Sequence, residues 1–295
     1  MTLSDIDVLE PKALGDALNV LRERSDRIKL IAGGTDAIIQ LKDRTLQAKE
    51  LLDISGLSEL RYIRGDGRTI RIGALSTYSD IVESSLLNQS CRVLVDASKM
   101  IGSLQIQNRA TIGGNLANAS PAGDTIPPLY ALAATITVQN HTGTRHIPIE
   151  RFFLGYRKID LRPDELITEI SFEAVEKPSD AAFLKVGLRE GHFISVANLA
   201  VWIQWARAGI KSSDIRVALG AVAPVVIRAR KCEEFLRGRA LEDDVIWQAG
   251  QIASGESSPI SDIRASAEYR RAVTSSLLYK AMHALIESHR AREKP

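Results

Sequence analysis

The segment TIGGNLANASPAGD, residues 111–124, contains a diglycine turn at Gly113-Gly114. Together with an earlier diglycine turn, it is the most informative feature of this chain. That earlier turn, Gly33-Gly34, lies in the segment KLIAGGTD, residues 29–36. Each diglycine follows an apolar or β-branched residue and precedes small polar residues. A residue without a Cβ adopts positive φ at low cost, so backbone N–H groups in such turns can approach an anion closely. Either turn alone has an equally simple interpretation as a tight turn, but the pair predicts a ligand that carries phosphates in its middle.

Neither turn carries a common nucleotide-binding fingerprint. Neither fits GxGxxG, and neither has the GxxxxGK[ST] spacing with its lysine, which disfavours a Rossmann site and a P-loop. Asp36 and Asp124 place negative charge near the expected anion. Two interpretations remain open for them: helix caps, or acceptors for a ribose, ribityl or ring N–H group. For Asp124 we favour contact with the ligand.

The composition is that of an ordinary soluble globular protein, with 45% hydrophobic and 25% charged residues. Its net charge is +2 without a basic cluster, so no nucleic-acid interface is expected. No apolar stretch approaches the roughly 20 residues needed to span a bilayer, and the acidic N-terminus does not resemble a secretory signal. We therefore expect a cytoplasmic protein without a membrane span.

The residues that usually carry metal or acid–base chemistry give no pattern. Cys91 and Cys232 are the only cysteines and form no CxxC, so this chain cannot build a zinc site or an iron–sulfur cluster alone. None of the five histidines has metal-ligand spacing or belongs to a discernible Ser–His–Asp set. We therefore predict no catalytic side chain and no metal ligand in this chain.

Hydrophobic patterning predicts two domains of α+β class. The first begins with a small α/β unit whose first diglycine lies between a strand and a helix, where phosphates are often bound. Two hairpins, several helices and a strand follow it. The second has three strand-like runs and then helices, an order typical of a separate α+β layer. We place the domains at 1–177, divided into 1–56 and 57–177, and at 178–290. The elements expected in the first domain are helices at 11–21, 37–41, 91–100 and 125–133 and one beginning at 76–82, strands at 28–32, 51–54 and 166–172, and hairpins at 60–73 and 135–149. Those expected in the second are strands at 181–187, 197–207 and 215–222, and helices at 230–236, 244–253 and 267–288.

Lys185 is an unusual residue for the interior of a strand-like run. A solvated position at a sheet edge and an ammonium directed at a cofactor are equally open interpretations. The following loop, residues 189–193, ends in Phe193 and is in a position to overhang a bound ring.

The two diglycine segments resemble the paired FAD motifs of the flavoprotein (medium) subunits of molybdenum hydroxylases. Residues 32–36, AGGTD, and residues 111–124 carry this resemblance. The family includes the medium subunits of carbon monoxide dehydrogenase, nicotinate dehydrogenase and bacterial xanthine dehydrogenase. The resemblance extends over nearly the whole chain, because GLREG at 187–191 and GAVAP at 220–224 fall where the family has its C-terminal domain.

The resemblance implies a two-part FAD-binding domain of the vanillyl-alcohol-oxidase (PCMH) type, followed by a smaller α+β domain with a three-stranded sheet plus helices. It also implies that backbone amides of 31–37 and 111–115 wrap the FAD pyrophosphate. Ser120 and Asp124 then reach toward the flavin or its chain, and Ile167 and Lys185 line the cofactor from later strands. Ile101 stands where some relatives have an aromatic residue. The implied cofactor-binding residues are Ile31, Ala32, Gly33, Gly34, Thr35, Asp36, Ala37, Thr111, Ile112, Gly113, Gly114, Asn115, Ser120, Asp124, Ile167 and Lys185.

In function, the resemblance implies an electron-relay subunit. A molybdopterin-binding large subunit and a small subunit with [2Fe–2S] clusters would be its partners, in a dimer of heterotrimers. Electrons from those clusters would pass through FAD here to NAD⁺ or another acceptor. The protein would bind, orient and electrostatically tune the flavin. A self-sufficient FAD-dependent oxidase of a small alcohol or amine is the alternative, and a non-enzymatic nucleotide-binding module is a third possibility.

Overall fold

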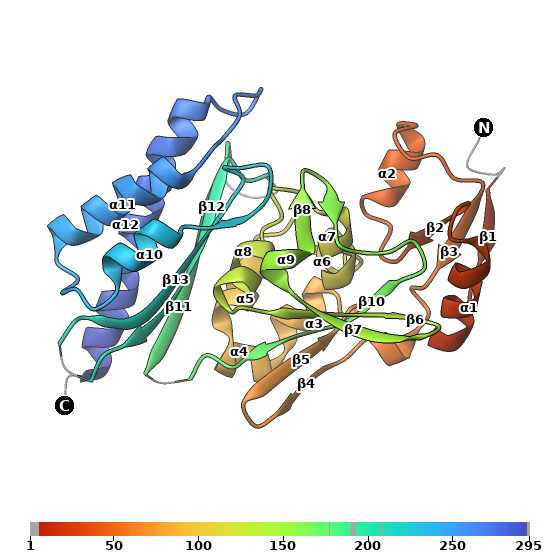
Figure 1. Cartoon of the computed structure of the whole chain (residues 1–295), viewed down its shortest axis with the longest axis horizontal. Helices are drawn as coiled ribbons and strands as arrows, with labels where there is room; N and C mark the ends of the chain where they lie inside the picture. The colour runs from red at the N-terminus through yellow and green to blue at the C-terminus, as the bar shows by residue number, and fades with distance from the viewer. Residues whose placement is uncertain (1–5, 177, 190–192, 208, 294–295) are drawn as a thin grey trace.

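The computed structural model describes residues 6–176, 178–189, 193–207 and 209–293, which form three units in a row (Figure 1). The N-terminal unit and the C-terminal unit lie at opposite ends of the molecule, with a middle unit between them. The architecture is α+β, as predicted. Within the described residues, no helix is long and apolar enough to cross a membrane.

The N-terminal unit is a three-stranded parallel sheet with two helices. Its strands are β1 (Asp7–Leu9), β2 (Ile28–Ile31) and β3 (Glu50–Asp53), in the order β1-β3-β2. Helix α1 (Leu14–Arg24) buries Leu18 and Leu21 against this sheet. The helix begins later than predicted, because Ala13 is extended and the Leu14 N–H donates to the Glu59 carboxylate at 2.6 Å. Helix α2 (Ala37–Lys42) follows β2 directly after the first diglycine.

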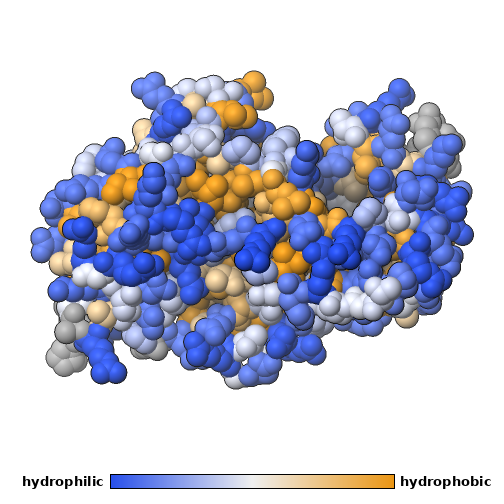
Figure 2. Space-filling model, in the orientation of Figure 1, coloured by the Kyte–Doolittle hydropathy of each residue, from blue (hydrophilic) through white to orange (hydrophobic). Residues whose placement is uncertain are grey.

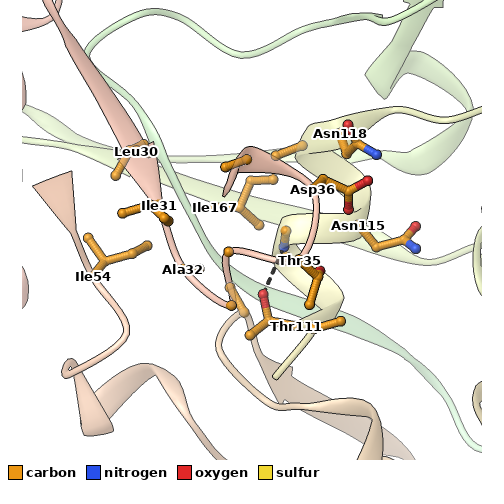
Figure 3. Close-up of a pocket in the computed structure, with 18 of the residues that line it drawn as sticks. Leu30, Ile31, Ala32, Thr35, Asp36, Ile54, Thr111, Asn115, Asn118 and Ile167 are labelled. Carbon is orange, nitrogen blue, oxygen red and sulfur yellow. Dashed lines mark hydrogen bonds between the residues drawn. The ribbon is translucent and has the colours of Figure 1, made fainter. Parts of the chain in front are cut away.

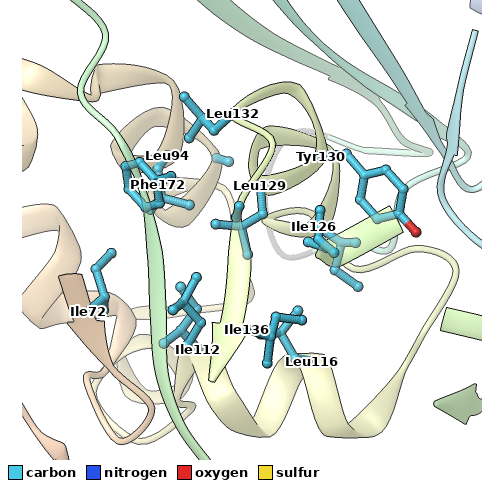
Figure 4. Close-up of a cluster of buried hydrophobic side chains, with 14 of the residues drawn as sticks. Ile72, Leu94, Ile112, Leu116, Ile126, Leu129, Tyr130, Leu132, Ile136 and Phe172 are labelled. Atoms are coloured by element: carbon cyan, nitrogen blue, oxygen red, sulfur yellow. The ribbon is translucent and has the colours of Figure 1, made fainter. Parts of the chain in front are cut away.

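The middle unit is built on a five-stranded antiparallel sheet of order β4-β5-β10-β6-β7. Both predicted hairpins are present in it, and β10 pairs between them. Its core contains Ile72, Ile136 and Phe172 from the sheet, packed against Leu94 and Ile112 from the helices (Figure 4). The strands are β4 (Ile63–Asp66), β5 (Thr69–Gly73), β6 (Thr135–Asn140), β7 (Gly143–Pro148) and β10 (Leu166–Glu173).

Most of the chain between these strands forms short helices, which pack against the sheet. The second diglycine lies in the first turn of one of them, α7 (Ile112–Asn118). The others are η2 (Ser58–Leu60), α3 (Tyr78–Glu83), α4 (Ser85–Ser90), α5 (Arg92–Lys99), α6 (Leu104–Gln107), α8 (Ile126–Ala131) and α9 (Ile149–Phe152). A small hairpin of β8 (Phe153–Gly155) and β9 (Lys158–Ile159) precedes β10 and was not predicted.

The C-terminal unit is an antiparallel sheet of order β11-β12-β13-β14, covered on one face by helices α10 to α12. The prediction of three strands is corrected to four, because the two-residue β14 pairs with β13. A strand of two residues has no alternation that a sequence pattern can reveal. The elements are β11 (Ser179–Val186), β12 (Ala197–Trp205), β13 (Ser212–Gly220), β14 (Ile227–Arg228), α10 (Arg230–Leu236), α11 (Asp243–Glu256) and α12 (Ala267–Glu293). The other face of the sheet contacts α5 and α8 of the middle unit.

Candidate functional site

The two diglycine turns lie against each other, although they belong to different units. A Cβ on Gly33 would lie 1.9 Å from the carbonyl oxygen of Arg109, two residues before the second motif begins. The second turn is held in place by Thr111, whose hydroxyl caps α7 by accepting from the Gly114 N–H at 3.1 Å (Figure 3). Gly113 donates to the carbonyl of Ala74 at 2.9 Å. The absence of a side chain at Gly33 therefore allows the first loop to approach the segment that leads into the second.

A cavity of about 460 Å³ lies between the two turns, within the usual size range of cofactor pockets. Figure 3 shows apolar Leu30, Ile31 and Ile54 on one side of it and the polar side chains of Thr35 and Asp36 on the other. Most of the predicted site residues line this cavity: Ile31, Ala32, Gly33, Gly34, Thr35, Asp36, Ala37, Thr111, Gly113, Gly114, Asn115 and Ile167. Four predicted residues do not line it: Ile112, Ser120, Asp124 and Lys185.

The cavity wall offers unused hydrogen-bonding groups. The backbone N–H groups of Gly34, Thr35 and Asp36 donate to no other described residue, and Gly34 has a φ of +76°. Consecutive free amides in a turn form an anion-binding concavity. The Oδ1 of Asn115 is buried and has no hydrogen-bond partner among the described residues. A ligand with a diphosphate and adjoining polar groups fits these donors and this acceptor.

Asp36 lies at the N-terminus of α2, but its side chain makes no capping hydrogen bond. Its backbone is helical, with φ of −100° and ψ of −47°, whereas a capping residue is normally extended. The capping interpretation of Asp36 is therefore wrong. Burial raises the pKa of the Asp36 carboxyl, while the charge of Arg157 and a hydrogen bond from Asn118 partly offset that rise.

Asp36→Asn is expected to increase the free energy of unfolding of the cofactor-free protein at neutral pH. Because the folded carboxyl has a pKa above 3.8, the wild-type protein loses stability as the pH rises from 3.8 through the folded pKa. Asparagine does not ionise and avoids that loss. The difference should be present at pH 7 and should disappear at about pH 3, where both states are protonated. Chemical denaturation at the two pH values measures it, with Asp43→Asn at the exposed far end of α2 as control. An Asp36→Asn protein no more stable than wild type at pH 7 would contradict this account.

Asp124 and Lys185 form a buried ion pair between the middle and C-terminal units. The Lys185 side chain is 0% exposed, and its Nζ lies 2.7 Å from Oδ2 of Asp124 and 2.8 Å from the carbonyl oxygen of Met100. Oδ1 of Asp124 accepts hydrogen bonds from Ser195 at 2.6 Å and Asn198 at 2.9 Å. The interpretation of Lys185 as a solvated edge residue is therefore wrong. Although β11 is an edge strand, this side chain points into the junction between the units. Contact of either residue with a cofactor remains a prediction.

The other predicted residues outside the cavity have local structural contacts. Ile112 is fully buried in the core of the middle unit, and the Ser120 hydroxyl accepts from the Ala122 N–H at 3.3 Å. Phe193 places its ring 4.2 Å from Nζ of Lys185 and so closely over Gly187 that a Cβ there would clash. Residues 190–192 of the predicted overhanging loop lie outside the described residues.

Several cavity residues gave no sequence signal. Tyr78 is buried at the start of α3, and its hydroxyl lies 3.3 Å from Oγ1 of Thr125. Burial raises the pKa of Tyr78 well above its usual value. The Thr77–Asp80 capping box that positions this helix is recognisable in the sequence as TYSD, residues 77–80. The remaining unpredicted lining includes Ile106, Ala110, Asn118, Arg157 and Leu161. Arg157 reaches the cavity from the β8–β9 hairpin, which no periodicity revealed.

Comparison with known proteins identifies both parts of the chain. Residues 4–172 match the family described as FAD binding domain in molybdopterin dehydrogenase. Residues 182–285 match the CO dehydrogenase flavoprotein C-terminal domain. The boundary that we place near residue 178 lies between the two matched segments.

Individual relatives match over most of their length. The chain is 31% identical over 274 residues to the carbon monoxide dehydrogenase medium chain of Hydrogenophaga pseudoflava, covering 93% of this chain and 94% of that one. It is 34% identical over 243 residues to the nicotinate dehydrogenase FAD-subunit of Eubacterium barkeri, covering 81% and 82%.

The solved structures agree with the sequence relatives. A chain of the Hydrogenophaga pseudoflava carbon monoxide dehydrogenase that lacks the Mo-pyranopterin moiety of its cofactor superposes with a TM-score of 0.92, covering 96% of this chain and 98% of that one. The cavity at the junction of two units, the two family matches and this superposition agree with one another. The chain belongs to the family of FAD-binding medium subunits of molybdenum hydroxylases, and residues 4–172 are its FAD-binding domain.

Proposed function

We propose that this chain relays electrons through FAD, from [2Fe–2S] clusters on a partner subunit to NAD⁺ or another acceptor. The observation that carries the proposal is the cavity between the two diglycine turns, with its free amides at Gly34, Thr35 and Asp36. When bound, FAD supplies the redox chemistry. The residues of this chain bind it, orient it and exclude water from its buried parts.

Within this proposal, the two turns hold the diphosphate of FAD. The free amides of Gly34, Thr35 and Asp36 donate from one side. The start of α7, residues 111–115, faces the same space and contributes the positive end of the helix dipole, because the N–H groups of 112–115 already donate inside the protein. Asn115 Oδ1 is an acceptor for a donor group of the cofactor, because it has no partner among the described residues. Ile167 contributes an apolar wall. Ser120, Asp124 and Lys185 are proposed to support the flavin end from behind this wall.

The partners in this proposal are a molybdopterin-binding large subunit and a [2Fe–2S] small subunit, assembled as a cytoplasmic dimer of heterotrimers. Two cysteines cannot supply the four thiolates of one such cluster, so the clusters must lie on another chain. Both cysteines are buried free thiols, as is usual in a reducing compartment.

An exposed apolar surface favours a docked partner. Hydrophobic residues gather in the hollow between the two end units (Figure 2). The β8–β9 hairpin exposes Leu154 by 67% and Tyr156 by 62%. Contiguous apolar surface on a soluble protein commonly marks an interface, and this surface adjoins the hairpin that lines the cavity.

The test has two parts. Purification of the full chain and its visible spectrum should show stoichiometric bound FAD, or its uptake after addition of FAD. A colourless protein that takes up no FAD would overturn the proposal and favour a non-enzymatic module. Affinity purification of the tagged chain from its native host should then recover a molybdenum-containing larger subunit. Recovery of the chain alone, with turnover of small alcohols or amines by oxygen, would favour the self-sufficient oxidase.

A further inference from the structure

Arg157 lines the cofactor cavity from an unexpected direction. It lies at the tip of the β8–β9 hairpin of the middle unit, whereas the first diglycine loop belongs to the N-terminal unit. Its backbone adopts φ of +52°, a conformation that residues with a Cβ rarely adopt. Strain of this kind persists where surrounding structure imposes it, and it is concentrated at functional sites. A glycine at this position would remove the strain but also the guanidinium.

The hairpin that carries Arg157 is fixed at its base and open at its tip. Phe153 is buried in the core and pairs with Ile159. The chain after the hairpin is anchored by Arg145, whose guanidinium lies 2.9 Å from the Asp160 carboxylate and 2.7 Å from that of Glu165. Arg157 itself is exposed at the mouth of the cavity. The base therefore holds the guanidinium near the cavity, where its Cζ lies 5.8 Å from the centre of the exposed Tyr156 ring and its N–H groups remain accessible to a ligand.

The charges around the cavity favour a cation beside Asp36 when an anion is bound. The charged residues that line it, among those described, are Lys29, Asp36 and Arg157. Asp36 adjoins the free amides that we assign to the diphosphate, so its carboxylate opposes a bound dianion. Burial raises the pKa of the Asp36 carboxyl, and the positive charge of Arg157, which lines the same cavity, partly offsets that rise. A guanidinium with several donors is well suited to bridge a carboxylate and a phosphate.

We propose that Arg157 binds the diphosphate of FAD, closing the cavity over the first diglycine loop and neutralising the adjacent carboxylate of Asp36. This inference rests on the proposed FAD site. It assigns the β8–β9 hairpin as a third phosphate-binding segment beside the two glycine loops. Without Arg157, the diphosphate and Asp36 would repel each other, and only the amides and Lys29 would remain to compensate.

The test measures FAD affinity of the full-length apoprotein by quenching of flavin fluorescence, at about 20 mM and about 500 mM NaCl. Arg157→Gln should raise the FAD Kd about tenfold at low salt, and by only about twofold to threefold at high salt, since salt screens exposed charges. Arg157→Lys keeps the charge and should recover most of the affinity. Lys158→Gln is the matched control, because it removes the same charge from the adjacent exposed residue, which does not line the cavity.

Each outcome of this test either supports or overturns the proposal. A salt-dependent loss of FAD affinity in Arg157→Gln, without such a loss in Lys158→Gln, supports the proposal. An unchanged Kd in Arg157→Gln overturns it, as does an equal loss in Lys158→Gln, which would indicate only general charge attraction. A loss that does not depend on salt and is not recovered by lysine indicates a purely structural role and also overturns it. Failure of the wild-type chain to bind FAD would instead overturn the FAD site itself, so the two failures are distinguishable.

Discussion

Gly33→Ala is expected to weaken FAD binding by more than about a hundredfold, which corresponds to about 2.7 kcal/mol of binding free energy. The added Cβ would lie 1.9 Å from the Arg109 carbonyl oxygen and 2.7 Å from its carbon. Both atoms belong to the backbone, so no side-chain rotation relieves the clash. The first glycine loop must move away from the segment that leads into Thr111. The two halves of the cradle then no longer face one ligand.

The measurement is FAD titration of the apoprotein, together with chemical denaturation to separate a local displacement from unfolding. Overpacking of this kind costs about 1–3 kcal/mol of stability, so a folded variant with lost affinity is the expected result. Gly56→Ala is the control, because this glycine is exposed and an added Cβ would meet nothing within 4 Å. Wild-type affinity in Gly33→Ala would show that contact between the loops is not needed for the cofactor.

Lys185→Met is expected to lower the free energy of unfolding by about 3–5 kcal/mol. The methionine fills similar volume, but Asp124 keeps a buried carboxylate that has lost its cation. Met100 also loses a donor for its carbonyl oxygen. Because these groups join the middle unit to the C-terminal unit, the substitution weakens the junction between the two units. Urea denaturation followed by circular dichroism measures it.

A double substitution separates the unpaired charge from lost packing. Lys185→Met combined with Asp124→Asn removes both charges and should be less destabilised than Lys185→Met alone. Arg92→Gln is the surface control, since its ion pair with Asp96 is exposed on both sides. That control should change stability by less than about 1 kcal/mol. If the double variant were more destabilised than the single one by the full cost of Asp124→Asn, the ion pair would not be the source of the effect.

The local elements were largely predictable because their signals are local. The alternation around the turns at 65–67 and 141–143 predicts the two hairpins, and both occur in the middle unit. Helix α12 and strand β12 lie where the sequence predicts a helix at 267–288 and a strand at 197–207. Elements of two residues, such as β14, have no period to detect and form only because a neighbouring strand offers hydrogen bonds.

The cavity was predictable only where a backbone requirement restricts the residue type. Glycines at 33, 34, 113 and 114 reveal a close backbone approach, because any other residue would clash or strain there. At Arg157 and Tyr78, no backbone requirement restricts the residue type to glycine. An arginine on an exposed hairpin and a tyrosine at a helix start have the same local sequence whether or not they face a cavity.

The two glycine turns, the α+β class and the membership of a flavoprotein family follow from the sequence alone, since each rests on short-range patterns. The roles of the charged residues depend on the tertiary structure. In the folded chain, Lys185 pairs with Asp124, which lies 61 residues away in sequence. The Asp36 side chain lies beside the cavity and makes no capping hydrogen bond, and Arg157 reaches the same cavity from another unit. The energy of a charge depends on the distance and burial of its partners, and those are properties of the folded chain that no local pattern contains.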